Sequence, residues 1–111
     1  MLKVNGTGIR LTRGDTIRFT VRLTGYDVPD GTKTVFTVKK RAWRHGEPVI
    51  EQEIPVIDNA VHVMLSPEVT NVDAGDYVWD LRVFIDAEND NYVMTPMEYA
   101  SFCVMEAIGH E

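Results

Sequence analysis

The sequence predicts an all-β protein, an antiparallel β-sandwich of seven to eight short strands. Apolar and polar residues alternate over several short stretches, clusters of turn-forming residues separate these stretches, and no segment repeats with the period of a helix. The 111 residues are the length of one domain, so we expect a single domain over residues 1–111. Cys103 is the single cysteine, which excludes an internal disulfide and leaves packing to hold the core.

The first strands are expected over residues 8–11 and 16–23. In the second stretch every other residue from Ile17 to Leu23 is apolar, which is typical of a strand with one buried face. A turn at Arg13-Gly14-Asp15 separates the two strands. This tripeptide also spells an integrin-binding motif, but a glycine between two strands is sufficiently explained as a turn.

The middle of the chain continues as strands and turns. Residues 33–43 are rich in β-branched residues, although the adjacent Val35 and Phe36 leave the register of this strand open. Residues 49–57 are expected at a sheet edge, because Pro55 lacks a backbone donor. Asp58-Asn59 is a two-residue turn signal, so residues 60–65 are expected to pair back with the preceding strand.

A short helical turn and the main core strand follow. Ser66-Pro67-Glu68 combines an N-cap serine, a proline at the first helical position and an acid in the first turn. The run from Asp73 through Gly75 to Tyr77 and Trp79 then has the pattern of a tyrosine corner leading into a core strand, in which the Tyr hydroxyl bonds to backbone upstream. These four residues are predicted to be architectural. The last strands are expected over residues 92–95 and 98–105.

Charge is unevenly distributed along the chain. The net charge is -6, which argues against a nucleic-acid partner. Ten of the 11 Lys and Arg residues lie in residues 1–44, whereas only three of the 17 acids precede position 45. Opposite charges on neighbouring strands are the favoured explanation. The alternative is a dipolar module that binds copies of itself or a charged partner.

The sequence offers no set of residues suited to catalysis or to cofactor binding. The three histidines are scattered, and Cys103 lies in an apolar strand where a free cysteine is more often a core residue than a nucleophile. The loop Asp86–Asn91 carries carboxylates at alternate positions that suit calcium, but it departs from the EF-hand pattern and is better explained as a hairpin loop. We therefore predict no enzyme, no metal site and no cofactor.

The basic and aromatic segment over residues 39–44 is a candidate interface. Arg41, Trp43 and Arg44 are the residues expected to contact a partner, because Trp and Arg are enriched at the centres of protein interfaces. A charged strand end that discourages unwanted pairing is the simpler alternative. Aromatic residues near loops, Tyr26, Trp43 and Tyr92, also leave open a carbohydrate-binding or adhesion module.

Three segments carry a resemblance to a known family. They are Leu11-Thr12-Arg13-Gly14-Asp15-Thr16, Phe36-Thr37-Val38-Lys39-Lys40, and Leu65-Ser66-Pro67-Glu68 followed by the run from Asp73 to Leu81. Together they resemble small immunoglobulin-like domains from bacteriophage and prophage structural operons, similar to the N-terminal domain of baseplate upper proteins. The likeness covers residues 9–105, and its most specific part is the Gly-x-Tyr-x-x-Asp-Leu run after the Ser-Pro-Glu turn.

This resemblance implies an immunoglobulin-like fold and a non-enzymatic accessory domain of a phage tail or baseplate. It implies protein–protein contacts with other virion proteins or with copies of the same chain, and no catalytic residues. No apolar signal segment follows Met1, so we expect assembly in the bacterial host cytoplasm and no membrane partner. A small-molecule ligand is not expected. A hydrolase using clustered acids is the weakest alternative, because the acids are scattered.

Overall fold

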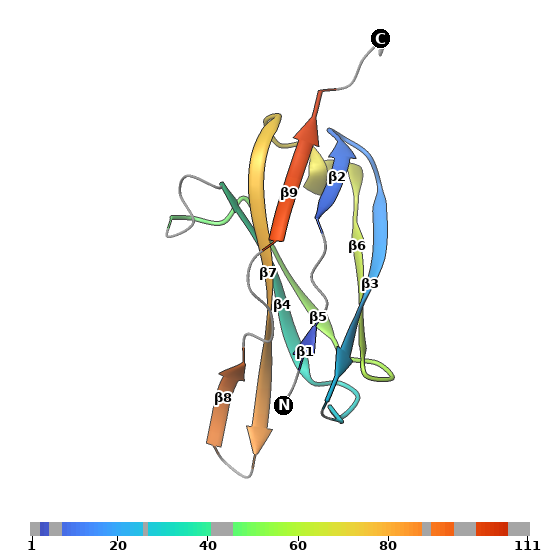
Figure 1. The fold of residues 1–111 in the computed structure, drawn as a ribbon, viewed down its shortest axis with the longest axis vertical. Helices are drawn as coiled ribbons and strands as arrows, with labels where there is room; N and C mark the ends of the chain where they lie inside the picture. Colours follow the sequence, from blue (N-terminus) through green and yellow to red (C-terminus); the bar gives the residue numbers. More distant parts are fainter. Residues whose placement is uncertain are drawn as a thin grey trace.

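The structure is a computed structural model that describes residues 3–4, 8–25, 27–40, 46–87, 90–94 and 100–106. The protein is mostly β, as the sequence predicts, and its strands form two sheets with one short helix (Figure 1). In chain order the elements are β1 (Lys3–Val4), β2 (Ile9–Thr12), β3 (Ile17–Thr24), β4 (Lys33–Lys40), β5 (Ile50–Pro55), β6 (Ala60–Leu65), α1 (Pro67–Thr70), β7 (Gly75–Ala87), β8 (Asp90–Met94) and β9 (Ala100–Met105).

The smaller sheet has the order β1-β3-β6, and both pairings are antiparallel. β3 and β6 pair over six residues, from Ile17↔Leu65 to Arg22↔Ala60. β1 pairs with β3 only at its lower end, where Lys3 lies opposite Thr24. A strand of two residues is too short to show alternation, so β1 was not predicted from the sequence. The described strands therefore number nine rather than seven or eight.

The larger sheet has the order β2-β9-β7-β4-β5, with β8 paired to the far end of β7. The prediction of a purely antiparallel protein is wrong here, because β2 and β9 run parallel from Ile9↔Phe102 to Thr12↔Met105. The chain leaves the small sheet after β1 and joins the large sheet as β2. Because of this change of sheet, β2 lies beside β9 and runs in the same direction. The predicted edge position of Pro55 is confirmed, since β5 is the last strand of this order.

The core lies between the two sheets. Phe19 of β3 makes edge-to-face contacts with Phe36 of β4 and Trp79 of β7, with ring centroids 5.8 Å apart in both pairs. Such pairs add to the burial of apolar area. The buried core residues are Leu11, Val21, Leu23, Val28, Phe36, Val38, Ile50, Ile54, Val56, Val61, Val63, Leu65, Tyr77, Trp79, Leu81, Val83, Phe102 and Val104.

The structure resolves the register of β4 that the sequence left open. Phe36 and Val38 are fully buried and face the core, so Val35 faces the outside of the large sheet together with Thr37. Cys103 is also on the outer side of its strand, because its neighbours Phe102 and Val104 point into the core. The expectation that this cysteine serves as a core residue is therefore wrong; it is half-buried and lies opposite Arg10 of β2.

The hairpin between β5 and β6 connects the two sheets. Ile57 and Ala60 exchange backbone hydrogen bonds of 2.9 and 3.0 Å around the two turn residues. Asp58 and Asn59 have φ values of 56° and 57°, as a type I′ turn requires. The prediction of the turn is confirmed, but the prediction that residues 60–65 pair back with the preceding strand is wrong. After the turn the chain passes to the other layer, and β6 pairs with β3.

The Ser-Pro-Glu pattern forms a single helical turn, α1, as predicted. Ser66 is the N-cap, and its hydroxyl accepts a hydrogen bond of 3.4 Å from the amide of Val69. Thr70 at the other end is fully buried, and its hydroxyl donates to the carbonyl of Asp15 at 2.6 Å. This bond fixes α1 against the turn that precedes β3.

Candidate functional site

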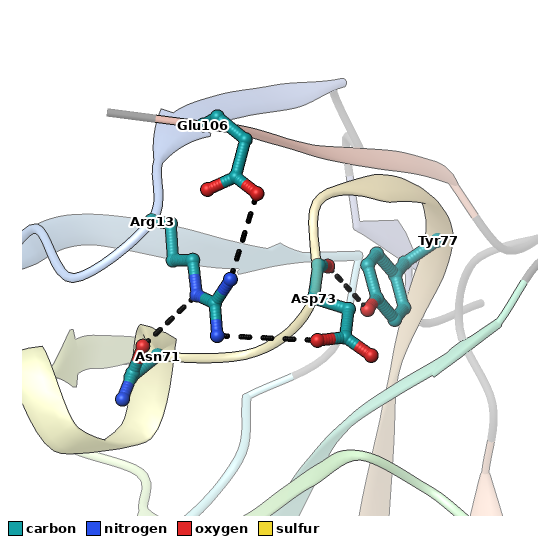
Figure 2. A network of polar contacts seen from close by, with 5 residues as sticks. All are labelled: Arg13, Asn71, Asp73, Tyr77 and Glu106. Atoms are coloured by element: carbon teal, nitrogen blue, oxygen red, sulfur yellow. Dashed lines mark hydrogen bonds and ion pairs between the residues drawn. The ribbon is translucent and has the colours of Figure 1, made fainter. Parts of the chain in front are cut away.

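The tyrosine corner is the first group of predicted site residues. The Tyr77 hydroxyl donates to the carbonyl oxygen of Asp73 at 2.6 Å, which closes the bend before β7 (Figure 2). Burial raises the pKa of Tyr77 above its ordinary value of 10.0, and the Asp73 carboxylate adds to this while Arg13 opposes it. Gly75 has a φ of 157°, a conformation that glycine adopts far more readily than other residues. Trp79, two residues beyond Tyr77, is 2% exposed and packs in the core.

Arg13 is the centre of the polar network around this corner, a role that the sequence analysis did not predict. Its Nε donates to Oδ1 of Asn71 at 3.0 Å, and its two terminal nitrogens lie 3.9 Å from Asp73 and 3.6 Å from Glu106 (Figure 2). The Arg13 amide also donates to the carbonyl of Met105 at 2.7 Å. The network joins the ends of three segments that are distant in the sequence. Arg13 therefore stabilises the fold at this end of the molecule.

The predicted interface residues Arg41, Trp43 and Arg44 lie outside the described residues. The same holds for Tyr26, one of the aromatic residues considered for carbohydrate binding. The loop considered for calcium is described only in part, and its backbone forms a β7–β8 hairpin with Asp86 opposite Asn91. Within the described ranges, no three His, Cys, Asp or Glu residues are grouped so that they would hold a metal ion. Nor does any described helix have the length and apolarity needed to cross a membrane.

The outer face of the small sheet carries an unpaired positive charge. We call it the basic face and define it by Arg18, Thr20, Arg22, His62 and Met64, all of which are exposed. Neither β3 nor β6 contains an acidic residue. Thr20 Oγ1 and His62 Nδ1 lie 3.2 Å apart across the two strands. The Met64 side chain adds apolar surface, since the residue is 49% exposed.

The charge on this face is not neutralised by neighbouring strands. In the described part of the chain, neither Arg18 nor Arg22 takes part in an ion pair. Of the ion pairs there, those of Arg13 join an early base to late acids, whereas Arg82 pairs with Glu51 inside the acidic half. Among the described residues, cross-strand pairing, the explanation favoured from the sequence, therefore accounts for only a small part of the charge distribution.

A groove borders the basic face, between β2 and β3. We call it the β2–β3 groove; it has a volume of about 350 Å³ and is lined by residues 8–10, residues 17–21 and Trp79. The half-buried side chains of Ile9, Ile17 and Phe19 pack against the core below it. Arg10 and Arg18 belong to the two strands that form its sides. The groove is thus apolar at its base, with an arginine on each side.

The outer face of the large sheet has a different character. Thr37 and Asp80 lie opposite each other on β4 and β7, and Thr37 Oγ1 and Asp80 Oδ1 are buried without a hydrogen-bond partner. Burial raises the pKa of Asp80 above its ordinary value of 3.8, while Arg82 and Lys39 partly oppose the shift. Basic and acidic side chains alternate here, so this face lacks the single sign of charge seen on the basic face.

Comparison with known proteins adds no family assignment. No protein-family model matches the chain, and no curated protein matches it either. What the site does must therefore be inferred from its own geometry and from the resemblance of its sequence motifs.

Proposed function

We propose that this chain is a non-enzymatic accessory domain of a bacteriophage or prophage virion, in a tail or baseplate, that acts through protein–protein contacts. Its partners would be other virion proteins or copies of itself. The observation that carries the contact function is the basic face, where two exposed arginines have no ion-pair partner among the described residues and neither β3 nor β6 contains an acid. Exposed charge of one sign beside an apolar surface is typical of a surface that recognises an oppositely charged protein.

An immunoglobulin-like sandwich is the finer fold assignment that we propose. Strand order supports it: β9-β7-β4-β5 corresponds to strands G, F, C and C′ of a variable-type domain, and β3-β6 corresponds to B and E. The hydrogen bond from Tyr77 at the start of β7 is further support, because a tyrosine corner lies at the start of strand F. The parallel pairing of β2 with β9 and the absence of a described strand D are departures from the simplest form of that fold.

The virion assignment rests on the sequence resemblance and is tested on particles. In a host whose genome carries this gene, induced particles are purified by density gradient and their proteins are identified by mass spectrometry. We expect the chain among the tail proteins, and neighbouring tail or portal genes in the genome. Gradient-purified particles that lack the chain, while the cell lysate contains it, would show that it is not a virion component.

A further inference from the structure

We propose that the open edge of β3, beside the β2–β3 groove, takes up an acidic extended segment of a partner protein as an added strand. This inference rests on the proposed contact function and specifies its partner and its geometry. Adding a strand to a sheet edge is a common mode of peptide recognition, in which backbone hydrogen bonds supply affinity and pockets for alternate side chains supply specificity.

Among the described residues, only β1 pairs with this edge of β3, so the backbone of β3 beside the groove is available for such pairing. In an antiparallel pair, the N–H and C=O of one residue point to the same side, and successive residues alternate between sides. The Leu23 amide bonds to the carbonyl of Asn59, so the odd-numbered residues of β3 face β6. Arg18, Thr20 and Arg22 therefore direct their backbone groups to the other edge, which β1 covers only at Thr24.

No described segment occupies this edge above β1. Within the described ranges, Arg18, Thr20 and Arg22 take part in no hydrogen bond on this edge, and the Thr20 side chain bonds to His62. Figure 1 shows β1 at the lower end of β3 and β2 beside its upper part. An added strand would lie in the β2–β3 groove, beside Arg18 and Thr20.

The groove provides places for alternate side chains of such a strand. Side chains on its inward face would contact Ile9, Ile17 and Phe19, which are only partly buried by the core. Side chains on its outward face would lie beside those of Arg18 and Arg22, because an added strand runs roughly 4.8 Å from its neighbour. The segment that fits best therefore alternates apolar residues with acidic ones.

Charge disfavours the symmetric pairing of β3 with the β3 of a second copy of this chain. Symmetric pairing of two β3 edges would bring Arg18 and Arg22 of one copy next to the same residues of the other, and like charges on adjacent strands are destabilising. An acidic segment instead neutralises both arginines. The charge of the site thus favours an acidic partner, and it favours binding with the acidic side chains on the outward face, beside Arg18 and Arg22.

The test uses the full chain and synthetic peptides of about six residues, the usual length of a strand. One peptide alternates Glu and Val, a second alternates Lys and Val, and a third alternates Glu and Pro, which keeps the charge but lacks half of the backbone donors. Binding is measured by calorimetry, and the site is located from amide chemical shifts. We expect the Glu-Val peptide to bind and to shift amides of β3 and β2, with much weaker binding of the other two.

Two proline variants test the edge itself. Thr20→Pro removes a donor from the open edge of β3 without removing a backbone bond to β6, and should weaken binding of the Glu-Val peptide about tenfold. The matched control is Glu53→Pro, on a strand outside the basic face. Because the Val56 amide donates to the carbonyl of Thr32, odd-numbered residues of β5 face away from β4, so this variant removes a donor from the free edge of β5, where Pro55 already lies. It should leave binding unchanged.

Charge reversal tests the same site without altering the backbone. Arg18→Glu combined with Arg22→Glu should abolish binding of the Glu-Val peptide and permit binding of the Lys-Val peptide, even where a proline variant fails to fold. Equal binding of all three peptides, no binding at millimolar concentration, or shifts confined to β6 would overturn the proposal. The purified particles decide the virion assignment separately, since the chain can be a virion component whether or not this edge binds a strand.

Discussion

The Tyr77 hydroxyl illustrates how one hydrogen bond fixes a bend of the backbone. It donates to the carbonyl of Asp73 at 2.6 Å in a largely buried setting. Tyr77→Phe should lower the free energy of unfolding by about 1 kcal/mol, the usual contribution of such a bond, as measured by chemical denaturation. Asp73→Asn is the matched control, because it retains the accepting carbonyl and changes a side chain that is 85% exposed. If Tyr77→Phe were as stable as the wild type, the hydroxyl bond would not contribute to stability.

Asp80 is predicted to make stability depend on pH. Its folded-state pKa is raised, so folding takes up a proton between the ordinary value of 3.8 and the raised one, and stability falls as pH rises through that window. Asp80→Asn removes the ionised form. The variant should therefore be more stable than the wild type at neutral pH, and this advantage should disappear once the pH falls below the ordinary pKa of an aspartate.

Thermal unfolding of both proteins across the acid range measures this difference. Thr37→Val is a useful companion, because it removes the unpartnered hydroxyl opposite Asp80 without changing a charge. Its effect should not vary with pH. An advantage of Asp80→Asn that grew in acid would contradict the sign derived from burial.

At the scale of elements, the turn between β5 and β6 depends on Asn59. Its side chain accepts from the Val28 amide at 2.6 Å and donates to the Leu23 carbonyl at 2.7 Å, while its φ of 57° lies in the left-handed region. Asn59→Ala should cost about 2–3 kcal/mol, from two lost hydrogen bonds and a strained backbone. Asn59→Gly should cost less, because it removes only the bonds. Equal losses in denaturation experiments would mean that the backbone conformation is not strained.

The elements differ in how far the sequence predicts them. Alternation predicts β3 and β7 well, because one face of each strand meets the core and the other does not. For β4, Val35 and Phe36 are equally apolar, and the choice between them depends on contacts with Phe19 and Trp79 from other strands. The pairing of β6 was mispredicted because a tight turn specifies that two strands are close, but not that they remain in the same sheet.

The candidate site is predictable to a smaller degree. The tyrosine corner has a local pattern, since Tyr77 and its acceptor are four residues apart. The basic face combines β3 and β6, and the groove combines β2, β3 and β7, so neither leaves a local pattern. The absence of acids in β3 was visible in the sequence, but its meaning depends on which strands surround it.

At the scale of the whole molecule, the distribution of charge predicts the oligomeric state. The basic face repels its own copy, and the described ion pairs do not compensate it. The isolated chain should therefore be a monomer by size-exclusion chromatography with light scattering at both low and high salt. Dimers that form at low salt and dissociate at high salt would instead indicate contact between the basic face of one copy and an acidic surface of another.

The parallel pairing of β2 and β9 determines how the domain would respond to mechanical force. β2 comes near the start of the chain and β9 near its end, and they lie side by side over four residue pairs. Tension applied before β2 and after β9 pulls two parallel strands in opposite directions along their length. Their hydrogen bonds are then loaded together in shear and cannot open one at a time. A domain connected in this way transmits a pull along its chain while the layers behind it remain packed.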